Sequence, residues 1–154
     1  MPLDLHGRTR SDRLIQLSIL LALIHHADHV LRADHSGWPF TSLVTPFSYS
    51  LLVYPLLIAA LALKGSGWLR VALVLVVFVF TQFAHMMIET PHDQFHTWAA
   101  GRSDFVERMG NPNLLHIASP LLGYFAVVVS VALSFALIAT LVSLVADARF
   151  AARR

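Results

Sequence analysis

The sequence predicts an all-α integral membrane protein: a bundle of four transmembrane helices with a short interfacial helix between the third and fourth spans. Of its 154 residues, 56% are hydrophobic and only 13% are charged, and the mean hydropathy is +0.66. Soluble domains carry about 25% charged residues. Because the chain is short and has no internal repeat or long polar linker, we expect one membrane domain that spans residues 1–154.

Four apolar runs give the expected spans. Each has 18 residues or more, and about 20 residues suffice for a helix to cross a hydrocarbon core about 30 Å thick. The runs cover residues 14–31, 43–63, 68–88 and 114–146. After the third run, Thr90-Pro91-His92-Asp93 has the order of an N-cap, a proline in the first turn and an early acidic residue. We therefore expect a short outer helix over about 91–109; whether Pro91 breaks the third span is left open.

The distribution of basic residues predicts the orientation. With four spans both termini lie on one side, together with eight of the eleven basic residues: Arg8, Arg10, Arg13, Lys64, Arg70, Arg149, Arg153 and Arg154. The positive-inside rule then places both termini in the cytoplasm. The basic residues flank apolar runs, so the pI near 9.5 indicates contact with the bilayer surface and not with nucleic acid.

Nine histidines are the unusual feature of the composition, and all but His6 map to the outer, extracytoplasmic half of the predicted bundle. Ionisable groups in membrane segments are costly and mark functional sites by default. The candidate metal ligands are His25, His26, His29, His85, His92, His96 and His116. Two carboxylates in the same layer, Glu89 and Asp28, are candidate catalytic groups, as ligands, proton acceptors or supports for an imidazole N–H.

These residue types indicate a transition-metal centre. The chain has no cysteine, and imidazoles with a few carboxylates suit iron, copper or zinc better than magnesium or calcium. Seven candidate histidines exceed the needs of one ion, so two ions are conceivable. We expect a metal-dependent membrane enzyme, an oxidoreductase in the leading interpretation, that acts on a hydrophobic, lipid-soluble substrate entering from the side.

Three alternatives remain open from the sequence. A b-type haem held between histidines such as His29 and His85 would carry electrons. A metal or proton transporter would use histidines and acids as a path, although we expect the inner halves of the predicted spans to lack ionisable groups. An accessory subunit of a larger membrane complex, or a homo-oligomer, is the third.

The number of outer histidines is similar to that of the membrane-bound non-haem di-iron hydroxylases and desaturases. Of their histidine boxes, however, only His92-x-x-x-His96 has a counterpart here, and His25-His26-x-x-His29 runs in the reverse sense. The sequence is therefore not assigned to that family.

Overall fold

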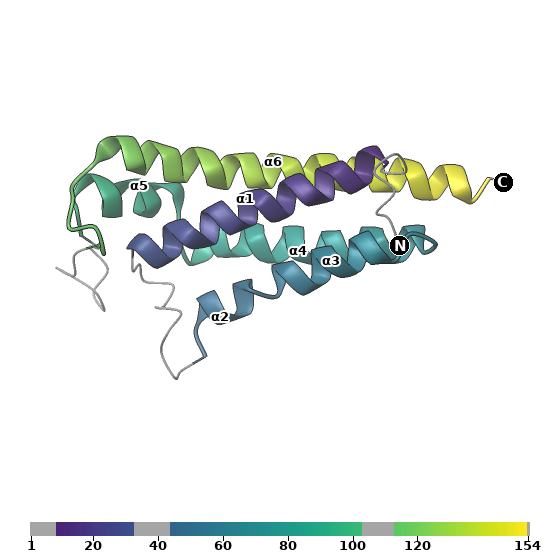
Figure 1. Ribbon diagram of the computed structural model, residues 1–154, viewed down its shortest axis with the longest axis horizontal. Coiled ribbons are helices and arrows are strands. Elements are labelled where there is room, and N and C mark those ends of the chain that lie inside the picture. Colours follow the sequence, from purple (N-terminus) through teal and green to yellow (C-terminus); the bar gives the residue numbers. More distant parts are fainter. Residues whose placement is uncertain (1–8, 33–43, 103–112, 154) are drawn as a thin grey trace, which may run out of the picture.

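The computed structural model describes residues 9–32, 44–102 and 113–153, and these residues form helices and connecting turns (Figure 1). The helices are α1 (Arg10–Arg32), α2 (Pro46–Ser50), α3 (Val53–Ala62), α4 (Gly67–Met87), α5 (Pro91–Ala99) and α6 (Pro120–Ala151). Three of them, α1, α4 and α6, are long and apolar enough to cross a membrane. The predicted helical membrane fold is confirmed at this level.

The second predicted span, residues 43–63, differs from the expectation, because its described part forms two shorter helices, α2 and α3, instead of one. Pro55 explains the break. Proline has no N–H to donate to the carbonyl of Leu51, four residues earlier. The N–H of Tyr54 donates to that carbonyl instead, over 3.2 Å, which makes a tighter turn of three residues. Of the two pieces, α3 runs along α4 and also contacts α1, whereas α2 stands apart below them and reaches α1 through Phe47 (Figure 1).

The third predicted span ends at Met87, and α5 starts as a separate helix at Pro91. Thr90 and Asp93 form the capping box that starts α5: the Thr90 N–H donates to Asp93 Oδ2 over 2.9 Å, and the Asp93 N–H donates to Thr90 Oγ1. The helix ends at Ala99 and not near Met109, because Gly101 adopts φ +74° and turns the chain away. Residues 103–112, which the prediction included in part, lie outside the described residues.

The packing of α1 against α6 organises the bundle. Buried positions recur at alternating spacings of four and three residues in both helices, the pattern of knobs-into-holes packing. They are Ser11, Ile15, Ser18, Ala22, His25, His29 and Arg32 in α1, and Ala126, Ser130, Leu133, Leu137, Thr140 and Leu144 in α6. The two helices run in opposite directions (Figure 1), and the polar members of the α1 repeat meet polar residues of α6 along the interface: Ser11 meets Ser143, Ser18 meets Thr140 and His25 meets Ser130.

A buried ion pair lies at the end of the bundle where α1 begins. The Arg70 guanidinium donates to Asp12 Oδ1 over 2.6 Å and to the carbonyl of Ala60 over 2.7 Å, and Lys64 Nζ lies 3.8 Å from Asp12 Oδ2. The expectation that this half of the spans has no ionisable groups is therefore wrong. Arg70 reads as a flanking charge in the sequence, but the first turn of α4 directs it inward.

A candidate metal centre

Two histidines in the last turns of α1 point at a common place. His25 and His29 are four residues apart and so lie on one face of the helix, with Nε2 atoms 2.9 Å apart and rings at 86° to each other. Both residues are buried. The i,i+4 spacing predicted this convergence correctly.

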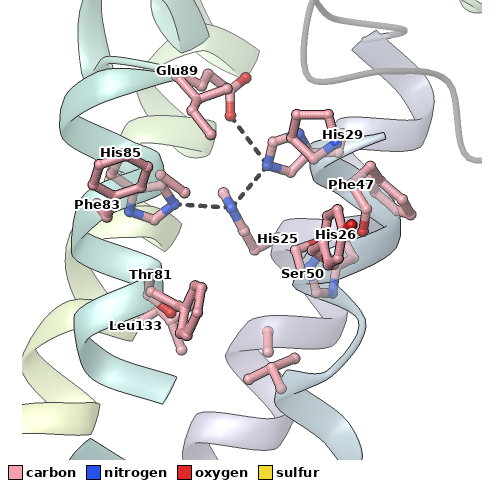
Figure 2. Close-up of a pocket in the computed structure, with 17 residues that line it drawn as sticks. His25, His26, His29, Phe47, Ser50, Thr81, Phe83, His85, Glu89 and Leu133 are labelled. Atoms are coloured by element: carbon pink, nitrogen blue, oxygen red, sulfur yellow. Dashed lines mark hydrogen bonds and ion pairs between the residues drawn. The ribbon is translucent and has the colours of Figure 1, made fainter. Parts of the chain in front are cut away.

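The end of α4 supplies the other two members. His85 Nε2 lies 3.0 Å from His25 Nε2, and Glu89 Oε2 lies 3.0 Å from His29 Nε2 (Figure 2). Glu89 lies two residues beyond the end of α4, yet its N–H still bonds to the carbonyl of Ala84 over 2.9 Å, so the chain makes one wide turn before α5 begins. That turn brings Glu89 back toward the face that carries His85. We call His25, His29, His85 and Glu89 the histidine–glutamate cluster.

Protons alone do not satisfy this cluster. Four atoms, Glu89 Oε2 and the Nε2 atoms of three imidazoles, are joined in a row by three contacts of 2.9 to 3.0 Å. A neutral imidazole nitrogen either carries one hydrogen or accepts one. The Nε2–H of His29 can therefore point at Glu89 or at His25, but not at both. One cation placed among His25, His29 and Glu89 would use the lone pairs of these three groups, because their ligand atoms all lie within 4.8 Å of one another. His85 adjoins this group through its contact with His25.

Hydrogen bonds behind the cluster hold its members in place. The Ser130 hydroxyl of α6 lies 3.2 Å from His25 Nδ1 and donates to Gln94 Oε1 of α5 over 2.8 Å. On the other side the Arg32 guanidinium contacts Glu89 Oε1 and donates to Asp28 Oδ2 over 2.6 Å. Such contacts behind metal-binding side chains orient the imidazole and carboxylate groups.

Asp28, a predicted catalytic residue, supports the cluster from outside it. Its second carboxylate oxygen accepts from the Trp98 indole N–H over 2.7 Å, which ties α1 to α5. Asp28 is not among the residues that line the adjoining cavity. Asp28 therefore forms an ion pair with Arg32, which the i,i+4 spacing of the two residues allows, and does not face the cavity.

His26 lies beside the cluster but faces another partner. Its Nδ1 lies 2.6 Å from the hydroxyl oxygen of Tyr54 in α3, and its ring centre is 5.9 Å from that of His25. Phe47 packs edge-on against both His26 and His29, at 5.3 and 5.9 Å between ring centres. His26 therefore links α1 to the α2–α3 segment.

The three remaining candidate ligands lie elsewhere. His92 and His96 stack on each other on α5 with ring centres 5.7 Å apart, and the His92 side chain is 80% exposed. His116 is exposed and adopts φ +54° in the turn before α6, where its N–H bonds to the carbonyl of Asn113. None of the three lines the cavity beside the cluster.

The cluster forms one wall of a cavity of about 280 Å³. The other walls are mostly apolar and come from α1, α2, α3, α4 and one residue of α6, Leu133 (Figure 2). A hypothetical ligand in this cavity would thus meet polar atoms on the cluster side and hydrocarbon on the others.

Sequence reasoning missed Ser130, Gln94, Trp98 and Phe47. For Ser130 a signal was present: it interrupts a run of valine and alanine in the fourth span at a position of the buried four–three repeat. Gln94 and Trp98 occupy the buried face of α5, four residues apart. Nothing local in the sequence indicates which histidine or acid they contact.

Comparison of the chain with protein-family models, with curated proteins and with solved structures found no match.

Proposed function

We propose that the protein is a membrane metalloprotein in which His25, His29, His85 and Glu89 hold one transition-metal ion, and that this ion serves an oxidoreductase acting on an apolar molecule from the bilayer. The observation that carries the proposal is the convergence of three imidazole Nε2 atoms and one carboxylate oxygen through contacts of 2.9 to 3.0 Å. One ion accounts for His25, His29 and Glu89 as they stand, and a rotation of the His85 side chain, which already contacts His25, would bring in the fourth group.

The spacing of the donor atoms favours a metal with open positions. Two ligands at a right angle around an ion, each about 2.1 Å from it, lie about 3.0 Å apart, whereas tetrahedral ligands lie about 3.4 Å apart. The contacts of 2.9, 3.0 and 3.0 Å match the right-angle value. Six-coordinate iron with four protein ligands keeps two positions for substrate and oxidant, and a set of histidines with one carboxylate is typical of non-haem iron sites. Copper and zinc remain the alternatives.

The charges around the cluster also support a cation. Asp28 and Glu89, when ionised, carry two negative charges, and Arg32 between them carries one positive charge. All three residues are buried. A carboxylate that lies against imidazoles in a buried membrane segment is a favourable ligand for a divalent ion.

The same geometry disfavours the haem alternative. A porphyrin bound between two axial imidazoles must separate their nitrogens, but His25 Nε2 is in direct contact with the Nε2 atoms of both His29 and His85 and so occupies the space between the two. A transport path is disfavoured for another reason: between the Ser18–Thr140 pair and the cluster, the buried interface consists of Ala22, Leu133 and Leu137.

The proposal includes four membrane crossings with both termini in the cytoplasm. The segment Pro46–Ala62 is the short one, and at about 1.5 Å per residue it extends about 25 Å, enough for most of the hydrocarbon core. Two observations support this: α3 packs against α4 and α1, and Phe47 of α2 packs against His26 and His29 near the end of α1. Reporter fusions at the two termini and in the α3–α4 turn should all give cytoplasmic signals; a signal from the opposite side at one terminus would contradict four spans.

Metal analysis of the detergent-purified protein tests the centre itself. We expect about one transition-metal ion per chain in the wild type and strongly reduced metal in His25→Ala and in His85→Ala. His116→Ala is the matched control, because it removes an exposed imidazole outside the cluster, and it should keep the metal. A folded wild type that binds no metal after reconstitution, or equal loss of metal in all three variants, would overturn the proposal.

A further inference from the structure

The cavity beside the histidine–glutamate cluster has the size of one ring. Its volume is about 280 Å³, roughly twice the 150 Å³ cavity that binds benzene in another protein and just below the range of about 300–1,000 Å³ for drug-sized ligands. A whole lipid does not fit. The head of an amphiphile does, provided that its tail leaves through an opening.

The opening lies on the outer surface of the helices. Three aromatic residues line the cavity and are also strongly exposed: Tyr49 (64%), Phe80 (68%) and Phe83 (56%). They belong to α2 and α4, within segments that the proposed function places in the bilayer. Exposed side chains on such segments face lipid, so the cavity communicates with the bilayer from the side.

The walls favour a flat ring. Phe47 contributes an aromatic side chain from α2, next to His26 and His29. Aromatic side chains pack well against other rings, in offset or edge-to-face arrangements. A ring inserted from the lipid side would have aromatic neighbours at its edges and the cluster in front of it.

The polar wall of the cavity suits a ligand with one oxygen atom. Apart from the cluster and His26, three residues with hydroxyl groups line the cavity. Tyr49 lies at the opening, the Ser50 hydroxyl donates to the carbonyl of Phe47 over 2.7 Å, and Thr81 lies one turn before His85. A ligand with many polar groups would leave most of them without partners, which is costly in an apolar pocket. A single hydroxyl directed at the cluster avoids that cost.

We propose that the cavity binds the ring of a monocyclic phenol-type amphiphile, a class that includes quinol head groups. The ring oxygen would occupy an open position of the metal held by the cluster, and the alkyl tail would leave between Tyr49 and Phe80 into the bilayer. This inference names the substrate class and rests on the proposed function, because the oxygen has the metal as its partner.

The test uses the full-length protein in detergent, loaded with Co²⁺, whose visible absorption reports changes in its ligands. The probes are 4-octylphenol and octylbenzene, which differ by one hydroxyl group. We expect 4-octylphenol to shift the cobalt bands and to bind at least tenfold more tightly than octylbenzene.

Two variants locate the binding site. Thr81→Phe fills the cavity from α4 and should retain cobalt while its affinity for 4-octylphenol falls at least tenfold. Val79→Phe adds the same bulk on an exposed position of α4 outside the cavity and should behave as the wild type.

The outcomes separate this inference from the proposed function. If cobalt is bound but octylbenzene binds as tightly as 4-octylphenol, if the cobalt bands do not move, or if Thr81→Phe binds the phenol normally, the substrate class is wrong and the metal centre stands. If no metal is bound, the proposed function fails and this inference fails with it.

Discussion

Replacing Ser130 by alanine tests whether hydrogen bonds behind the cluster set its metal affinity. The single hydroxyl proton of Ser130 goes to Gln94 Oε1 over 2.8 Å, so its oxygen accepts the Nδ1–H of His25 over 3.2 Å. The ring nitrogen that faces the cluster, Nε2, is then the bare one that a metal needs. Ser130→Ala removes the acceptor and leaves the tautomer of His25 unconstrained. The loss of such a contact lowers metal affinity about 10- to 100-fold, or about 1.4 to 2.7 kcal/mol.

Competition with a chelator of known affinity, on purified protein in detergent, measures this effect. Ser134→Ala is the matched control. Ser134 lies one turn further along α6, is partly buried, and accepts from the Gln82 side chain over 2.9 Å, but it has no recorded contact with the cluster. We expect less than a threefold change in metal affinity for Ser134→Ala. If Ser130→Ala binds the metal as tightly as Ser134→Ala does, the hydrogen bond does not hold His25 in its metal-binding form.

Three further results are expected. Gly123→Ala places a Cβ 2.7 Å from the Phe95 carbonyl oxygen, so it should destabilise the protein by about 1 to 3 kcal/mol and lower its melting temperature, while Gly65→Ala, which meets no atom within 4 Å, should not. Asp12→Asn leaves the buried Arg70 without its carboxylate and should cost about 3 to 5 kcal/mol of unfolding free energy; an unchanged melting temperature would contradict a buried ion pair. Metal at a hundred times its Kd should stabilise the wild type by about 2.7 kcal/mol, and chelation should lower the melting temperature of the wild type but not that of His25→Ala.

Local periodicity explains what could be predicted from the sequence. The spacing of His25 to His29 places both on one face of α1, and the structure brings His85 and Glu89 to that pair. Glu89 lies beyond the end of α4, and a wide turn sets its position. The hydropathy of the long spans gave α1, α4 and α6 with bounds within a few residues, except that α6 begins at Pro120, six residues after the predicted start. Both signals depend only on neighbours along one helix.

Features that depend on backbone hydrogen bonds or on distant partners could not be read in this way. The second span was predicted as one helix because hydropathy does not depend on backbone hydrogen bonds. In the structure Pro55 cannot donate to the carbonyl of Leu51, and Tyr54 donates to it in a tighter turn. The sequence does not distinguish a carboxylate that binds a metal from one that, like Asp28, accepts hydrogen bonds from Arg32 and Trp98. That distinction requires knowing which side chain of α5 arrives beside it.

The polar residues in the α1–α6 interface show how the bundle keeps its cluster in register. Sliding one helix by a heptad, about 10 Å, would preserve the four–three match of apolar residues. It would also separate every polar pair along the interface: Ser11 from Ser143 and Asp147, Ser18 from Thr140, and His25 from Ser130. Buried hydroxyls without partners are costly in an apolar interface, so these pairs select one register. That register places His25 opposite Ser130 and next to His85, which is the arrangement that a preformed metal centre requires.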